Sequence, residues 1–204
     1  MIDLYTWGTP NGRKISIVLE ELNLDYRLHR IDITNGEQFG EEFLALNPNN
    51  KIPVIRDSSG PDGHPVTLFE SGAILVYLAD KTQRLLPISG FARYETIQWL
   101  MFQMGGIGPM FGQTHHFRRY AAEQKYSLER YTAETHRLYK VLDGKLAKSE
   151  FVAGGAYSIA DIAIYPWVAR FELHQLDWAA VPHVKRWYDT LSERPSVKRG
   201  MEAL

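Results

Sequence analysis

The sequence predicts a small α/β domain followed by an all-α domain. Strand and helix patterns alternate through residues 1–81 in the order βαβαββα. After Pro87 the strand signal ends and only long helical periods follow. We therefore expect one domain over residues 1–81, a linker over residues 82–88 and a helical domain over residues 89–204.

Composition sets limits on the function. The chain has 204 residues and a net charge of -1, without a block of basic residues, so nucleic acid and anionic membranes are not expected partners. No start resembling a signal peptide and no run of eighteen apolar residues is present, and we expect a cytoplasmic protein. The absence of cysteine excludes disulfides, cysteine-bound zinc and a protein thiol nucleophile. Any thiol chemistry must therefore use a sulfur that arrives on a ligand.

The first strand leads directly into a helix N-terminus. Residues 2–5 read as a buried strand, and an apolar helical face follows at Ile15, Val18, Leu19 and Leu22. Thr9 and Asn11 lie where that helix begins, next to Pro10. Unpaired N–H groups and the helix dipole favour an anion there, including a thiolate. An ordinary capped helix remains an alternative from these residues alone.

The rest of the first domain is expected to complete one sheet. A strand at residues 26–31 makes a parallel βαβ unit, and a short helix is expected at residues 38–46. A strand from Val54 pairs with residues 66–69 as a hairpin. Ser71 then stands at the N-cap of a helix that ends near Lys81, which brings the Glu70-Ser71 turn to the same end of the sheet as Thr9.

The second domain contains one strong local signal, a capping box. Ser158 can accept a hydrogen bond from the N–H of Asp161, and the Asp161 carboxylate can accept one from the N–H of Ser158. Asp161 is therefore expected to matter for stability and not for chemistry. Long helices are expected at residues 93–111, interrupted at 105–109, at 123–148 and, finally, at 183–191.

These motifs together resemble the cytosolic glutathione transferase superfamily along the whole chain. The resemblance rests on Thr9-Pro10-Asn11-Gly12, Asn50-Lys51-Ile52-Pro53, Glu70-Ser71 and Ser158-Ile159-Ala160-Asp161, and it is strongest to the bacterial nu class. It implies a thioredoxin-like first domain, a helical second domain and a homodimer. It also implies glutathione as co-substrate, bound as a reduced pair or as the disulfide, and no metal.

The resemblance assigns a role to each site residue. Thr9 and Asn11 would stabilise the glutathione thiolate, a catalytic role without nucleophilic attack. The cis-proline Pro53 would turn the Ile52 backbone outward, so that the N–H and C=O of Ile52 pair with the cysteinyl peptide unit. The remaining glutathione-binding residues are Glu70 and Ser71 for the γ-glutamyl end, Gln38 and Lys51 for the glycyl end or a second glutathione, and Arg130 from the partner subunit. Gln38 and Lys51 could equally be solvated side chains, and Arg130 an ordinary helix-surface arginine.

Three functions remain open from the sequence. The first is a glutathione-dependent disulfide-bond reductase, with weak peroxide reduction beside it. The second is a transferase that conjugates glutathione to electrophilic small molecules, and the third is a non-catalytic interaction module. His115 and His116 do not indicate a metal site, because adjacent residues on a helix diverge by roughly 100° and no further ligands cluster with them.

Overall fold

The computed structural model describes residues 1–204 and divides into two compact units. The first unit combines residues 1–84 with residues 194–204, and the second comprises residues 85–193. None of the helices is both long enough and apolar enough to cross a membrane.

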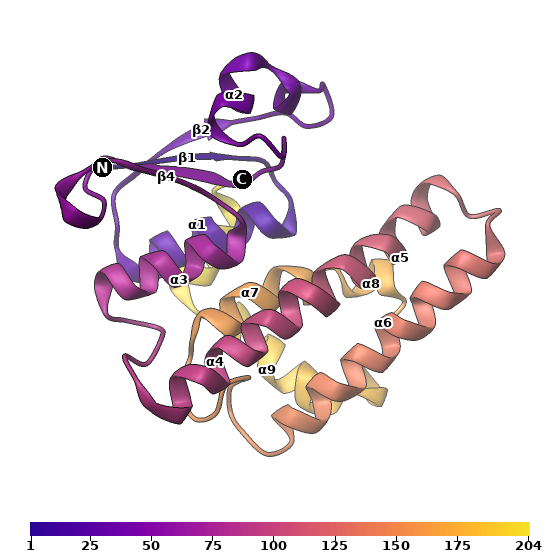
Figure 1. Cartoon of the computed structure of the whole chain (residues 1–204). Helices are drawn as coiled ribbons and strands as arrows, with labels where there is room; N and C mark the ends of the chain where they lie inside the picture. Colours follow the sequence, from indigo (N-terminus) through magenta and orange to yellow (C-terminus); the bar gives the residue numbers. More distant parts are fainter. The chain divides into compact units, whose positions relative to one another are not determined.

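The first unit is built on a four-stranded sheet in the order β2-β1-β3-β4. β1 and β2 are parallel, whereas β3 is antiparallel to both β1 and β4, which confirms the expected βαβ unit and hairpin. α1 and α3 lie on one side of the sheet and α2 on the other (Figure 1). The elements follow in the order β1 (Ile2–Thr6), α1 (Pro10–Leu22), β2 (Tyr26–Arg30), η1 (Glu37–Phe39), α2 (Glu41–Leu46), β3 (Val54–Asp57), η2 (Pro61–Gly63), β4 (Val66–Phe69), α3 (Ser71–Thr82) and, after the second unit, α10 (Pro195–Glu202).

Two details of the first unit differ from expectation. The single helix expected at residues 38–46 is divided into η1 and α2, because Gly40 between them has an extended backbone. The segment after Pro195, expected to end the helical domain, instead forms α10 and packs on α1. The Ser16 hydroxyl donates to the carbonyl oxygen of Gly200 at 2.5 Å, and Gly200 lies directly over the backbone of Ile17.

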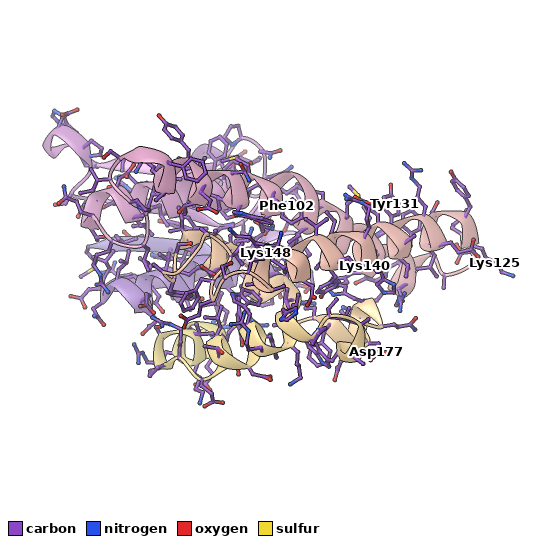
Figure 2. All side chains as sticks on the ribbon, turned by 90° about the horizontal axis from the view of Figure 1, so that it is seen from below. Phe102, Lys125, Tyr131, Lys140, Lys148 and Asp177 are labelled. Carbon is purple, nitrogen blue, oxygen red and sulfur yellow. The ribbon has the colours of Figure 1, made fainter.

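The second unit is a helical bundle. α5 and α6 pack side by side, and Figure 2 shows α6 running from Lys125 past Tyr131 and Lys140 toward Lys148. All residues of α7 are buried, so this helix lies in the core of the unit. The elements are α4 (Gly90–Phe102), the π-helix η3 (Gln103–Ile107), α5 (Gly108–Tyr120), α6 (Lys125–Leu146), α7 (Ile159–Val168), α8 (Phe171–His174), η4 (Trp178–Ala180) and α9 (Pro182–Ser192).

The expected interruption at residues 105–109 is a change of helix type and not a break. α4 continues through the wider π-helical turn η3 into α5. Pro109 has no N–H to complete an α-helical hydrogen bond, and a local π turn accommodates that loss without ending the helix.

Candidate functional site

Three chain segments come together at one end of the sheet in the first unit, where the ends of neighbouring strands lie side by side. The strand register pairs Tyr5 with Val54, and Val54 with Phe69. The end of β1, the start of β3 and the end of β4 are therefore neighbours. The turn at Thr9 follows β1, the Ile52-Pro53 bond precedes β3, and Glu70 follows β4. The strand pairing therefore brings these predicted site residues together.

Thr9 is the N-cap of α1, as expected. Its Oγ1 accepts a hydrogen bond from the N–H of Gly12 at 3.2 Å, and Pro10 occupies the first helical position. Because the hydroxyl oxygen acts as acceptor in this bond, the hydroxyl hydrogen can still be donated. Thr9 can therefore cap the helix and donate to an anionic sulfur at the same time. Asn11 lies half-buried in the first turn of the same helix.

The peptide bond between Ile52 and Pro53 is cis, the isomer that the resemblance implies. It lies between the positive-φ residue Asn50 and the first residue of β3. The side-chain amide of Asn47 donates to the carbonyl oxygen of Lys51 at 2.7 Å and so fixes the backbone just before the cis bond. The Lys51 side chain is exposed, whereas Pro53 is buried.

The Glu70-Ser71 turn differs in one respect from the sequence expectation. The N-cap of α3 is Glu70 and not Ser71, and no side chain caps the helix. Glu70 has a φ of 69°, which is rare for a residue other than glycine and costs about 1 to 3 kcal/mol. The exposed Glu70 carboxylate and the buried Ser71, the first helical residue, therefore stand together at a helix N-terminus, where an α-amino and a carboxylate group could be recognised as a pair.

Lys14 is a buried ionisable residue beside this cluster that the sequence did not single out. Its side chain on α1 is completely buried, and its Nζ donates to the Ser71 Oγ at 3.2 Å. Burial lowers the pKa of Lys14 to about 7, although attraction by Glu70 acts in the opposite direction. The available signal was its spacing, because Lys14 lies one helical turn before Val18 on the buried face.

Gln38 and Arg130 belong to other elements of the chain. Gln38 belongs to η1, and its buried Oε1 has no hydrogen-bond partner in the protein, so a ligand N–H or a water could satisfy it. Arg130 belongs to α6 in the second unit, where its exposed side chain lines a groove of 660 Å³. The other lining residues of that groove are Met110, Tyr131, Ala133, Glu134 and Arg137.

His115 forms a hydrogen-bonded chain with residues far away in sequence. His115 Nε2 lies 2.6 Å from His174 Nε2, and His174 Nδ1 lies 2.7 Å from the Tyr139 hydroxyl. Burial, together with the positive charges of nearby arginines, lowers the pKa of His115 to about 4. Two neutral imidazoles therefore pair in the second unit. No group of three or more His, Cys, Asp or Glu side chains is arranged to hold a metal ion.

The Ser158-Asp161 capping box is present as expected. The Asp161 carboxylate also accepts hydrogen bonds from the N–H of Val152 and the indole N–H of Trp187, both at 2.9 Å. Asp161 thus ties the start of α7 to a preceding loop and to α9, which is a structural role.

Two family models match the chain, one in its N-terminal part and one in its C-terminal part. Residues 9–81 match the family model of the glutathione S-transferase N-terminal domain, and residues 100–195 match that of the C-terminal domain. The chain is 50% identical over 203 residues to the disulfide-bond oxidoreductase YfcG of Escherichia coli, an alignment that covers 98% of this chain and 94% of YfcG.

Two solved structures are similar over nearly the whole chain. A glutathione transferase family member from Pseudomonas fluorescens with two glutathione bound is 49% identical, with a TM-score of 0.94 over 98% of this chain and 92% of that chain. A glutathione transferase from Pseudomonas putida with one glutathione disulfide bound per subunit is 45% identical, with a TM-score of 0.93 over 98% of this chain and 90% of that chain.

Proposed function

Because the chain belongs to the glutathione S-transferase family, we propose that it is a glutathione-dependent disulfide-bond reductase. The observation that carries this proposal is the convergence of Thr9, the cis Ile52-Pro53 bond and Glu70-Ser71 at one sheet edge in a chain without cysteine. Relatives named as disulfide-bond oxidoreductases or described with bound glutathione or its disulfide support it.

Without a protein thiol, both reducing equivalents come from glutathione. One glutathione thiolate attacks a substrate disulfide, which releases one substrate thiol and forms a mixed disulfide. The thiolate of a second glutathione then attacks the glutathione sulfur of that mixed disulfide. The second substrate thiol leaves and glutathione disulfide forms, so two glutathiones are oxidised for each disulfide reduced.

We assign the thiolate-stabilising role to Thr9, with Asn11 beside it in the first turn of α1. The α1 N-terminus and the Thr9 hydroxyl favour the charged form of the sulfur, whose pKa is about 8.5 when free. Ile52 pairs with the cysteinyl backbone, Glu70 and Ser71 hold the γ-glutamyl group, and Gln38 and Lys51 lie on the glycyl side or contact a second glutathione.

Steady-state turnover of glutathione with a small disulfide tests the proposal. Thr9→Ala should lower kcat about 10-fold or more while glutathione affinity changes less, because the hydroxyl acts mainly on the sulfur. Thr9→Ser, which retains the hydroxyl, is the matched control and should keep most of the activity. Equal losses of kcat and affinity in Thr9→Ala would assign Thr9 to positioning.

Parallel assays with a chlorinated aromatic and a hydroperoxide separate the transferase and peroxidase alternatives, and absence of all three activities would favour an interaction module.

The same proposal includes a homodimer in the cytoplasm. Two bound glutathiones carry several carboxylates, and the exposed Arg130 on α6 could neutralise part of this charge in the site of a partner subunit. A cytoplasmic location fits, because the glutathione pool there is kept reduced.

Calorimetric titration of Arg130→Ala tests the shared site. This variant should bind glutathione disulfide about 10-fold to 100-fold more weakly, with a smaller loss for a single glutathione. Arg130→Lys should restore only part of the loss, because lysine keeps the charge and not the planar fork. A monomeric chain in sedimentation, or unchanged disulfide affinity in Arg130→Ala, would contradict the shared site.

A further inference from the structure

Lys14 is the only buried lysine of the chain, and no part of the Lys14 side chain is exposed. Burying an ammonium group is costly unless another group compensates the charge. Lys14 lies on α1 where this helix faces α3, and its Nζ donates to the Ser71 hydroxyl oxygen. The site proposed for the γ-glutamyl carboxylate therefore has a titratable amine directly behind it.

A single charged neighbour, Glu70, affects the pKa of Lys14. Among the ionisable groups on the elements packed against α1, only Glu70 acts on the pKa of Lys14. The others are Tyr77, Asp80 and Lys81 on α3, and Lys198, Arg199 and Glu202 on α10; α1 itself carries Arg13, Glu20 and Glu21. The N-terminus of α3 at Ser71 adds partial positive charge. An anion beside Ser71 would thus meet two sources of positive potential, Lys14 and the helix.

The protonation state of Lys14 also decides which way the Ser71 hydroxyl can point. A protonated amine has three donors and no acceptor, so Ser71 Oγ must accept from it and its own hydrogen is directed elsewhere. A neutral amine has a lone pair that can accept, which allows the Ser71 hydrogen to turn inward. Only the protonated form thus requires the Ser71 oxygen to act as the acceptor between the two side chains.

We propose that Lys14 is a positioning residue that acts through Ser71, so that binding of the γ-glutamyl carboxylate is coupled to the uptake of one proton from solvent by the Lys14 amine. This inference rests on the proposed function, because it takes glutathione as the ligand of Ser71. It makes affinity for glutathione depend on pH through a group that neither contacts nor reacts with the sulfur.

The direction of this dependence follows from linkage. Burial lowers the pKa of Lys14 to about 7 in the free protein, and a carboxylate bound nearby raises it. The complex then holds more protons than the free protein above pH 7. Affinity should fall as the pH rises from 7, by at most about tenfold per pH unit, and be nearly constant below pH 6.

Calorimetric titration of S-methylglutathione into the full-length protein tests the inference, because this ligand has no titrating thiol. At pH 7.5, titrations in buffers with different ionisation enthalpies give the number of protons taken up. The wild-type protein should take up roughly half to one proton per ligand, and its affinity should fall several-fold between pH 6 and pH 8.

Lys14→Met removes the titrating group and keeps an apolar side chain of similar length. It should bind more weakly than wild type at pH 6, take up close to no protons and show the same affinity at pH 6 and pH 8. Lys140→Met, an exposed lysine on α6, is the matched control and should behave as wild type. Circular dichroism before each titration identifies the folded variants to be compared.

Equal proton uptake in Lys14→Met and wild type would overturn the inference and leave the proposed function intact. Tight binding by wild type without proton uptake would do the same. Failure of both glutathione and S-methylglutathione to bind the wild-type protein would instead remove the proposed function.

Discussion

Lys14 in the first unit and Asp161 in the second are both ionisable side chains without exposed surface, yet they are held in different ways. Both oxygens of Asp161 accept two hydrogen bonds each, from Val152, Trp187 and two groups of Ser158. Lys14 instead faces a serine hydroxyl at a helix N-terminus, in a site where a ligand is expected. A buried charge surrounded by donors from its own chain serves the fold, whereas one beside a ligand site can serve binding.

The largest expected effect comes from breaking the Asp161 network. Asp161→Ala leaves the Val152 N–H, the Ser158 N–H and the Trp187 indole N–H without their buried acceptor. The free energy of unfolding should fall by about 3 to 5 kcal/mol in urea titrations at pH 7. Turnover per folded molecule should not change.

Asp189→Ala is the matched control for this experiment. Asp189 is exposed and pairs with Lys185 along α9, so its removal should cost no more than about 1 kcal/mol. Equal losses in the free energy of unfolding for the two variants would contradict the stabilising role of the buried Asp161 network.

An intermediate effect is expected at Gly200, which holds α10 against the helix that carries Lys14. A Cβ at this position would lie 2.5 Å from the Cα of Ile17, so Gly200→Ala must push the two helices apart. We expect a loss of about 1 to 3 kcal/mol in the free energy of unfolding, again from urea titrations. Gly144→Ala on α6, where nothing lies near the added Cβ, should be neutral or stabilising. A fully stable Gly200→Ala protein would contradict this packing.

The smallest effect should have the opposite sign and comes from Lys14→Met. The pKa of Lys14 is lower in the folded protein than in the unfolded chain, where lysine titrates near 10.4, so the folded state binds fewer protons between about pH 7 and pH 10. The wild-type protein therefore gains stability from this group as the pH rises, and the penalty is greatest below pH 7.

Lys14→Met should accordingly be as stable as wild type or more stable at pH 6. Its advantage should shrink by about 2 kcal/mol between pH 6 and pH 9, measured by urea unfolding at both values. A large loss of stability at pH 6 would mean that Lys14 supports the fold as Asp161 does, and the contrast between them would disappear.

The features that the sequence predicted well are local. The Thr9 cap depends on residues within three positions, and the Ser158-Asp161 box also lies within one helical turn. Both were identified correctly because the partners of each hydrogen bond are near in sequence. The strand order allowed the Thr9 and Glu70 turns to be placed at the same sheet edge, and the observed register agrees with that placement.

The features that the sequence did not reveal depend on distant partners. The burial of Lys14 requires α3, whose Ser71 is 57 positions away, and a single helix pattern does not show which face such a neighbour covers. The His115-His174 pair likewise joins α5 to α8. Glu70 replaced Ser71 as the N-cap because its backbone adopts a positive φ, which residue type does not indicate for glutamate.

The return of α10 to α1 affects the order in which the protein can assemble during synthesis. In the sequence, residues of the first unit both precede and follow the second unit. The C-terminal helix α10 therefore emerges from the ribosome only after all of the second unit has been made. At about 5 to 20 residues per second, α1 waits on the order of ten seconds for its partner. During that interval the helical bundle can fold as an uninterrupted stretch of chain, whereas the face of α1 around Ile17, which α10 covers in the finished protein, stays uncovered. The unit that starts first is therefore the one that finishes last.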